Sequence, residues 1–228
     1  MNKKHVLTAA VAAAAMSAAM FVAQSQAADA EGPPPPMSFF ITSTDQDGNL
    51  GGLEGADALC TRLAQAAGSP ATTTWHAYLS TQGEGAVNAR DRIGNGPWHN
   101  AMGVKIADNV ADLHGDVDRE SNYIIQETGL DENGNAVPGR LGRAEGEANK
   151  HDIMTGSNSL GMAFPAGEDR TCNNWTSNGA GSAMLGHYDR SGGGNNVSWN
   201  AAHPSRSCSL PDLNATGGAG KLYCFAVN

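Results

Sequence analysis

Residues 38–60, SFFITSTDQDGNLGGLEGADALC, carry the signals that decide the fold. Residues 38–43 are mostly aromatic or β-branched and stand between proline and turn residues, which predicts a β-strand. The Asp- and Gly-rich stretch 45–49 predicts a turn. Apolar residues then recur every three or four positions, so we expect a helix over 53–67 with Cys60 on its buried face.

The chain before this segment has the pattern of an export signal followed by a spacer. Two lysines near the start, an apolar or small run over 6–22 and a small-x-small pattern ending at Ala27 predict a signal peptide over 1–27. The run is too short to predict a membrane anchor. Four consecutive prolines in 28–37 favour an extended tether, and a disordered tail fits this segment equally well. We therefore expect a secreted or periplasmic protein, or one associated with the cell surface, with no membrane span after cleavage and one domain over 38–228.

The charge and composition exclude several classes of protein. The sequence has 14 Lys and Arg against 23 Asp and Glu, a formal net charge of −9, and the predicted mature chain is more acidic still. Nucleic acid is excluded as an expected partner, because phosphate backbones select basic patches. A glycine count of 29 and the lack of a long amphipathic repeat favour one loop-rich domain of mixed α and β structure.

The rest of the chain adds two strands and a long loop region. The alternation of apolar residues in 75–81 predicts a second strand, and 221–227 predicts a third. Between them, 156–220 is rich in Gly, Ser and Asn, and a loop region this long is usually functional or poorly ordered. The four cysteines predict two disulfides with three possible connectivities in an exported protein: Cys60, Cys172, Cys208 and Cys224.

In this order the motifs resemble the C-type lectin fold in its endostatin-like branch, and more closely a group of secreted bacterial lectin-like proteins. The motifs that carry the resemblance are 40–43, 48–60, 75–81, 89–93, 96–98, 154–156, 172–177 and 222–225. The resemblance implies a single α+β, C-type lectin-like domain with a long loop region. It also implies two nested disulfides, Cys60–Cys224 and Cys172–Cys208.

The resemblance further implies an exported carbohydrate-binding or adhesive module, whose partner is a glycan or an extracellular or envelope protein. The lack of a GxSxG motif and of a free cysteine predicts that the protein is not an enzyme. The alternative is a structural or protein-interaction module of the envelope or matrix with no sugar ligand. Aromatic rings beside amides and carboxylates suit sugars, which makes six residues of the loop region ligand candidates: Tyr188, Asp189, Asn195, Asn196, Trp199 and Asn200. Core packing is the other interpretation of the rings.

The sequence departs from the sugar-binding C-type lectins at their calcium site. It lacks the Glu-Pro-Asn or Gln-Pro-Asp tripeptide, and Trp199-Asn200 is followed by Ala201 instead of Asp. We therefore expect no calcium-bridged sugar site and no cofactor. Calcium remains an alternative at Asp45, Asp47 and Glu54, although an ordinary turn is the stronger interpretation of this Asp/Gly pattern.

Other catalytic and metal motifs are weak. The sequence has no GxSxG motif, and two disulfides leave no free cysteine. The histidines of the predicted mature chain are scattered, so their spacing predicts no metal site, and only ligands from distant segments could form one. We expect His151-Asp152, beside Lys150, to lie in a solvated turn.

Overall fold

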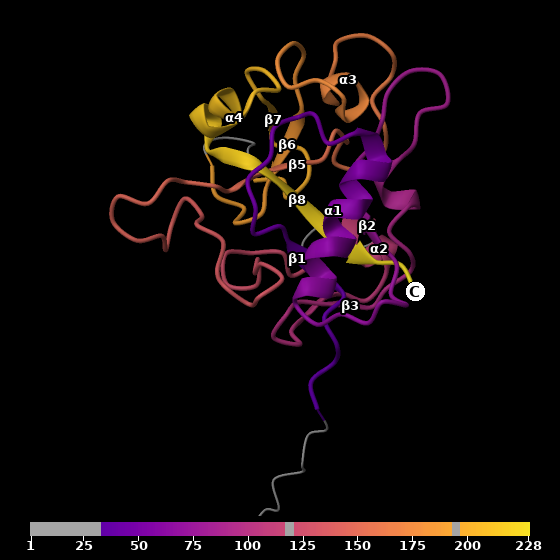
Figure 1. The fold of residues 1–228 in the computed structure, drawn as a ribbon, viewed down its shortest axis with the longest axis vertical. Coiled ribbons are helices and arrows are strands. Elements are labelled where there is room, and N and C mark those ends of the chain that lie inside the picture. The colour runs from indigo at the N-terminus through magenta and orange to yellow at the C-terminus, as the bar shows by residue number, and fades with distance from the viewer. Residues whose placement is uncertain (1–32, 117–120, 193–196) are drawn as a thin grey trace, which may run out of the picture. The chain divides into compact units, whose positions relative to one another are not determined.

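The computed structural model describes residues 33–116, 121–192 and 197–228, of which 34–228 belong to one compact unit (Figure 1). The predicted signal peptide, the first half of the tether and the candidates Asn195 and Asn196 lie outside the described residues. The unit combines helices with β-sheet and contains two disulfides, so the expected α+β class is confirmed. None of the helices in the described ranges has the length and apolar character needed to cross a membrane.

A six-stranded sheet forms the centre of the unit. Its strands, in spatial order, are β1 (Phe39–Ile41), β8 (Gly218–Ala226), β5 (Asp152–Met154), β6 (Met184–His187) and β7 (His203–Pro204), and β2 (Trp75–Ala77) also pairs with β8. Strand β8 is antiparallel to β1 and β2 and parallel to β5. Every residue of β8 is buried, as expected for a central strand, and β7 forms one edge of the sheet.

One long helix covers part of this sheet. Helix α1 (Gly52–Ala66) agrees with the predicted 53–67 and lies beside β2 and β8 (Figure 1). Its buried residues recur at three- and four-residue intervals and end at Ala64. The remaining elements are short: the helical turn η1 (Ala89–Asp91), strands β3 (Trp98–His99) and β4 (Lys105–Ala107), and helices α2 (Val110–His114), α3 (Cys172–Trp175) and α4 (Leu210–Thr216).

Two hydrophobic clusters form the core. Strand β8 contributes to both, because successive side chains of a strand point to opposite faces. Leu222 and Cys224 pack with α1 in the first cluster. Tyr223 and Phe225 belong to the second, which is rich in aromatic rings. The rings of Tyr188 and Trp199 also lie in this second cluster.

Two disulfides connect the elements. Cys60 of α1 is bonded to Cys224 of β8, and Cys172 is bonded to Cys208, which is the pairing that the resemblance implies. The first bridge fixes α1 to the central strand. The second closes a loop that contains β6 and β7.

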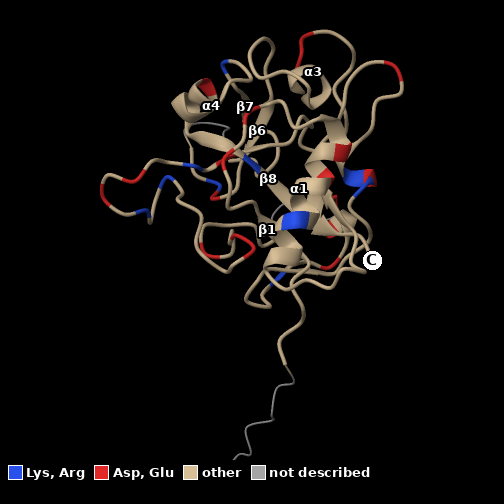
Figure 2. Cartoon of the chain, viewed as in Figure 1, with Lys and Arg blue, Asp and Glu red and all other residues tan. Residues whose placement is uncertain are grey.

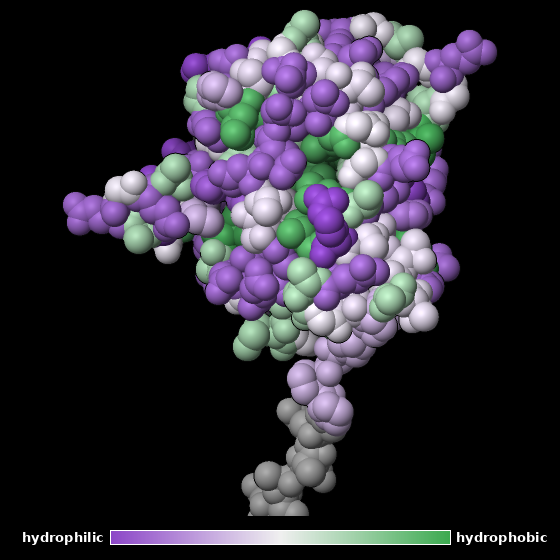
Figure 3. Space-filling view, viewed as in Figure 1, coloured by the Kyte–Doolittle hydropathy of each residue, from purple (hydrophilic) through white to green (hydrophobic). Residues whose placement is uncertain are grey.

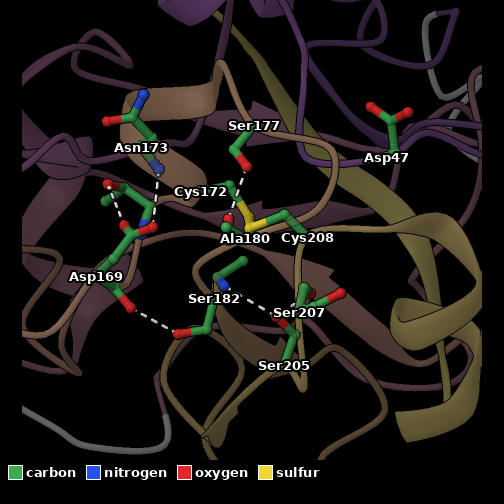
Figure 4. Close-up of a disulfide and its surroundings, with 12 residues drawn as sticks. Asp47, Asp169, Cys172, Asn173, Ser177, Ala180, Ser182, Ser205, Ser207 and Cys208 are labelled. Atoms are coloured by element: carbon green, nitrogen blue, oxygen red, sulfur yellow. Dashed lines mark hydrogen bonds between the residues drawn. A yellow bond between two sulfur atoms is a disulfide. The ribbon is translucent and has the colours of Figure 1, made fainter.

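The inner disulfide anchors an unusual turn at α3 (Figure 4). All four residues of Cys172–Trp175 have positive φ, between 49° and 67°, so the turn is left-handed. A left-handed conformation costs roughly 1–2 kcal/mol per residue, and only Gly, Asn and Asp adopt it routinely. The central pair, Asn173 and Asn174, fits this requirement, while Asp169 accepts a hydrogen bond from the Asn173 backbone amide at 2.9 Å. The turn is therefore held by the disulfide, by its asparagines and by Asp169.

Charged and apolar residues are dispersed over the surface. Figure 2 shows the Lys and Arg residues of the described chain scattered over several loops and α1, among acidic residues. On the face shown in Figure 3, apolar residues form separate patches between polar ones. The Lys and Arg residues are therefore not gathered in one segment, and the face in Figure 3 offers no single large apolar surface.

Candidate metal centre

The structure describes four of the ligand candidates, and the rings of the two aromatic ones are not exposed to solvent. Tyr188 and Trp199 are 0% and 5% exposed. The Trp199 ring lies 4.9 Å from the Tyr78 ring and 5.4 Å from the Tyr223 ring, measured between centroids. Both rings complete the aromatic core, which agrees with the core-packing interpretation of these two residues.

The polar candidates are also engaged inside the protein. The side-chain amide of Asn200 donates to the Tyr78 hydroxyl at 3.0 Å, and its oxygen accepts a hydrogen bond from Ser198 at 2.9 Å. The Asp189 side chain is 1% exposed and contacts His151. These side chains position other groups and do not form a free sugar-binding surface.

The three residues considered for calcium do not share one site. The Asp45 carboxylate pairs with Lys150 at 2.9 Å and with Lys221 at 3.2 Å. Burial raises the pKa of Asp45, but the two ammonium groups outweigh it and lower the pKa below the usual value. Asp47 accepts a hydrogen bond from the Asn49 amide within the turn, and Glu54 lies in the first turn of α1. The Asp45 carboxylate is therefore already neutralised by two lysine side chains.

A different cluster lies across β5, β6 and β7, which are neighbours in the sheet. Asp152 begins β5 and pairs directly with His187 at the end of β6. His203 begins β7 and pairs with Leu185, two residues before His187, so the side chains of His187 and His203 lie on the same face. His151 immediately precedes β5. The strand register brings together residues that are far apart in the sequence.

This cluster is buried, which corrects the expectation of a solvated turn. His151 is 4% exposed, Asp152 is 1% exposed and His187 is 3% exposed. The side chain of His203 is the most accessible of the four, at 26%. The sequence expectation was wrong because the polar triplet 150–152 carries no local sign that β6 and β7 cover it.

Three ring nitrogens surround one oxygen of Asp152. The Oδ1 atom lies 3.2 Å from His151 Nε2, 3.1 Å from His187 Nε2 and 3.7 Å from His203 Nε2. The Nε2 atoms of His187 and His203 are themselves 3.0 Å apart. Four ligand atoms around a tetrahedral zinc ion, each at about 2.0–2.1 Å, would be separated by roughly 3.3 Å. The cluster therefore has the spacing of atoms that share a cation.

Neither carboxylate oxygen of Asp152 accepts a hydrogen bond of acceptable geometry, although ring nitrogens lie within 3.2 Å. A buried carboxylate without such bonds is costly, and each one in a native protein calls for an explanation. The distances show close ion-pair contact, although neither oxygen has a hydrogen-bond partner. An ion placed between the nitrogens and the oxygen explains both observations.

The other ring nitrogens have oxygen partners. Nδ1 of His187 lies 2.8 Å from the Ser191 carbonyl, and Nδ1 of His203 lies 3.1 Å from the Pro204 carbonyl. A carbonyl only accepts, so these contacts assign the proton to Nδ1 and the lone pair to Nε2 in the neutral rings. Such contacts orient metal-binding histidines in known sites.

His151 differs, because both of its nitrogens face carboxylates. Its Nδ1 atom lies 3.0 Å from Asp189 Oδ1, while its Nε2 atom faces Asp152. Burial lowers the pKa of His151, but the two carboxylates outweigh it and raise the pKa to about 9. Burial raises the pKa of Asp189, but hydrogen bonds led by that from His151 lower it to about 2. Asp152 likewise has a lowered pKa despite its burial.

A groove of about 560 Å³ lies elsewhere on the unit, and we call it the Trp199 groove. Trp199 and Asn200 contribute to its lining together with Leu160, Arg190 and Val197. A second hollow of about 470 Å³ shares Arg190 and Val197 with it and includes Tyr123, which is 49% exposed.

The chain matches no protein-family model and no curated protein sequence. The site therefore has to be interpreted from its own geometry. The sequence signals that could have indicated it are the adjacent His151-Asp152 pair before a short apolar strand and the His187 and Asp189 that flank Tyr188. Neither signal has the spacing of a known metal motif, and only the register of the sheet joins them.

Proposed function

We propose that this protein is an exported module that binds one divalent transition-metal ion at the cluster of His151, Asp152, His187 and His203. The observation that carries the proposal is the buried Asp152 carboxylate, which lacks hydrogen bonds and faces three ring nitrogens. In the described part of the chain, His151, Asp152 and His187 form the only detected group of three or more His, Cys, Asp or Glu ligand atoms close enough to share an ion.

The donor atoms favour particular metals. Imidazole nitrogen with one carboxylate suits Zn²⁺, Fe²⁺, Ni²⁺ and Cu²⁺, whereas Ca²⁺ and Mg²⁺ prefer sites built from oxygen alone. The cluster joins three strands, so an ion bound there also links β5, β6 and β7. We therefore expect binding to be coupled to the stability of this side of the sheet.

Metal analysis of the purified protein tests the proposal. The protein is treated with a strong chelator, dialysed and titrated with Zn²⁺ and Co²⁺, and we expect one ion per chain. Asp152→Asn removes the carboxylate charge and should abolish stoichiometric uptake. Asp108→Asn, a change on an exposed residue, is the matched control and should bind as the wild type does. A folded wild-type protein that takes up none of these ions at stoichiometric concentration would contradict the proposal.

For the fold, we propose the C-type lectin-like class in its endostatin-like form, with export by the 1–27 signal. Support comes from the nested pairing of the cysteines and from the order of strand, cysteine-bearing helix, long loop region and final strand. Two disulfides are also compatible with an oxidising compartment outside the cytoplasm.

A second candidate function is recognition of a glycan or of an envelope protein at the second hollow, which Tyr123 and Arg190 line beside the Trp199 groove. It is favoured by the exposed ring of Tyr123 beside Arg190, since a ring face with polar neighbours suits a sugar. A glycan array with wild-type protein and Tyr123→Ala tests it. Specific binding that depends on Tyr123 supports carbohydrate recognition, and a lack of glycan binding favours the interaction module.

A further inference from the structure

We propose that only His187, His203 and Asp152 ligate the ion, that His151 positions Asp152 from outside the coordination sphere, and that the ion keeps an open position for an external nitrogen or oxygen donor. This inference deepens the proposed metal function and rests on it. It changes the expected class of the site, because four protein ligands make a closed structural site and three leave room for exchangeable ligands.

The three proposed ligand atoms have suitable mutual distances. They form a triangle with sides of 3.0, 3.1 and 3.7 Å. The point equidistant from its corners lies about 1.9 Å from each of them, slightly less than the usual zinc–ligand distance of about 2.0–2.1 Å. An ion just above the plane of the triangle therefore lies at coordination distance from all three atoms. Two histidines and one carboxylate that bind one face of a metal ion form a known type of site, in which the other coordination positions stay open to external ligands.

The geometry of His151 excludes it as a further ligand beside His187. The two rings are stacked, with centroids 4.0 Å apart and planes inclined by only 18°. An imidazole binds a metal along the lone pair of its nitrogen, which lies in the plane of the ring. Two stacked, nearly parallel rings share no nearby point that lies in both planes. Since the His187 ring turns its Nε2 toward His203 at 3.0 Å, His151 is the ring that is left out.

His151 instead connects two buried carboxylates. Its ring lies between Asp189 at 3.0 Å and Asp152 at 3.2 Å, so the two acids hold it on opposite nitrogens. Asp189 is in turn fixed by the backbone amides of Arg140 at 2.8 Å and Ser191 at 3.0 Å. Groups that orient ligands in this way typically change metal affinity by 10- to 100-fold when they are mutated.

The open position faces the edge of the sheet. Side chains of His151, Asp152 and His187 are at most 5% exposed, whereas that of His203 is 26% exposed. His203 belongs to β7, the edge strand, so solvent reaches the cluster on this side. A small donor such as imidazole or a carboxylate, free or on a partner's side chain, matches this access, and water fills the position otherwise.

Cobalt substitution tests each part of the inference in the full protein. Co²⁺ reports its coordination through its visible absorption, and imidazole and acetate are the probes for the open position. We expect the wild type to bind one Co²⁺ and to change its spectrum when imidazole is added. His151→Gln should still bind one Co²⁺, 10- to 100-fold more weakly, with a similar spectrum. His203→Gln should lose more than 100-fold in affinity, and His76→Gln, a partly exposed histidine away from the cluster, should match the wild type.

The outcomes separate this inference from the proposed function. Loss of Co²⁺ by His151→Gln together with retention by His203→Gln would overturn the ligand set and leave metal binding in place. A cobalt spectrum that does not respond to imidazole or acetate would overturn the open position. If the folded wild-type protein binds neither Co²⁺ nor Zn²⁺, the proposed function itself fails. Circular dichroism of each variant establishes that the protein analysed is folded.

Discussion

Single residues in this protein show how strongly burial controls the role of an aromatic side chain. Trp199 has polar neighbours in the sequence, which favoured a ligand-binding role, yet its ring contacts the rings of Tyr78, His114 and Tyr223. Its neighbours in the sequence gave no indication of this, because the contacting residues come from distant segments. The ring contributes mainly to the free energy of unfolding.

Trp199→Ala should therefore destabilise the fold by about 3–5 kcal/mol, the usual cost of removing a large buried aromatic side chain. Urea denaturation followed by fluorescence or circular dichroism measures this change. Val197→Ala is the control, because Val197 is 51% exposed and its truncation should cost less than about 0.5 kcal/mol. Equal stability of Trp199→Ala and wild type would show that the ring is not part of the core.

His114 predicts a pH dependence of stability. Burial lowers its pKa to about 4, while an unfolded chain would protonate it near the ordinary value of 6.5. The unfolded state therefore binds more protons between these values, so the stabilising contribution is present above pH 6.5 and is lost as the pH falls toward 4. At pH 5 the loss is about 2 kcal/mol. Denaturation at pH 7 and pH 5 should show a smaller loss for His114→Gln than for wild type, and equal losses would refute this role.

At the scale of elements, β8 explains why the sheet is stable despite its short strands. It joins β1, β2 and β5, and it places one cationic side chain in the interior. Lys221 is 2% exposed, and its ammonium group donates to the backbone carbonyls of Thr42 and Ser43 at 3.0 and 2.9 Å and contacts Asp45. This lysine fixes the chain after β1 against the central strand.

Lys221→Met keeps the length of the side chain and removes its donors. The Thr42 and Ser43 carbonyls then lose a partner in a buried region, and Asp45 keeps only Lys150. We expect a destabilisation of about 2–4 kcal/mol, since breaking a buried ion pair leaves the remaining groups uncompensated. Lys105→Met, at an exposed pair with Asp108, is the control and should leave the stability nearly unchanged, because solvent screens an exposed ion pair. Comparable losses in both variants would argue against a special role for Lys221.

On the scale of the whole molecule, a bound ion should stabilise the entire unit, because it links three strands of the sheet. A ligand present at 100 times its Kd stabilises the folded state by about 2.7 kcal/mol, or roughly 5–10 °C in Tm for a domain of this size. A chelator selective for transition metals should lower the Tm by this amount, and added Zn²⁺ should restore it. Asp152→Asn should not respond to either, and an identical response in this variant would place the ion elsewhere.

The parts of the fold that the sequence predicted are those set by local pattern. The three- and four-residue spacing of apolar residues predicted α1. Alternating apolar residues or β-branched and aromatic residues predicted β1, β2 and β8. The metal cluster was not predicted, because its residues carry no motif and meet only through the pairing of β5 with β6 and of β6 with β7. Local sequence fixes an element, whereas strand register depends on the packing of the whole sheet.

The position of β8 has a consequence for the order in which the molecule can be built. This strand follows all of its pairing partners in the sequence, and it also carries the second half of the outer disulfide. A nascent chain that ends before residue 218 thus has β1, β2 and β5 but lacks the strand that joins them. Such a chain cannot complete the sheet during synthesis, and the slow, long-range pairing of β1 and β2 with β8 is deferred until residues 218–226 have been made. The sequence order by itself therefore makes the joining of the two sides of the sheet a late step in the formation of the fold.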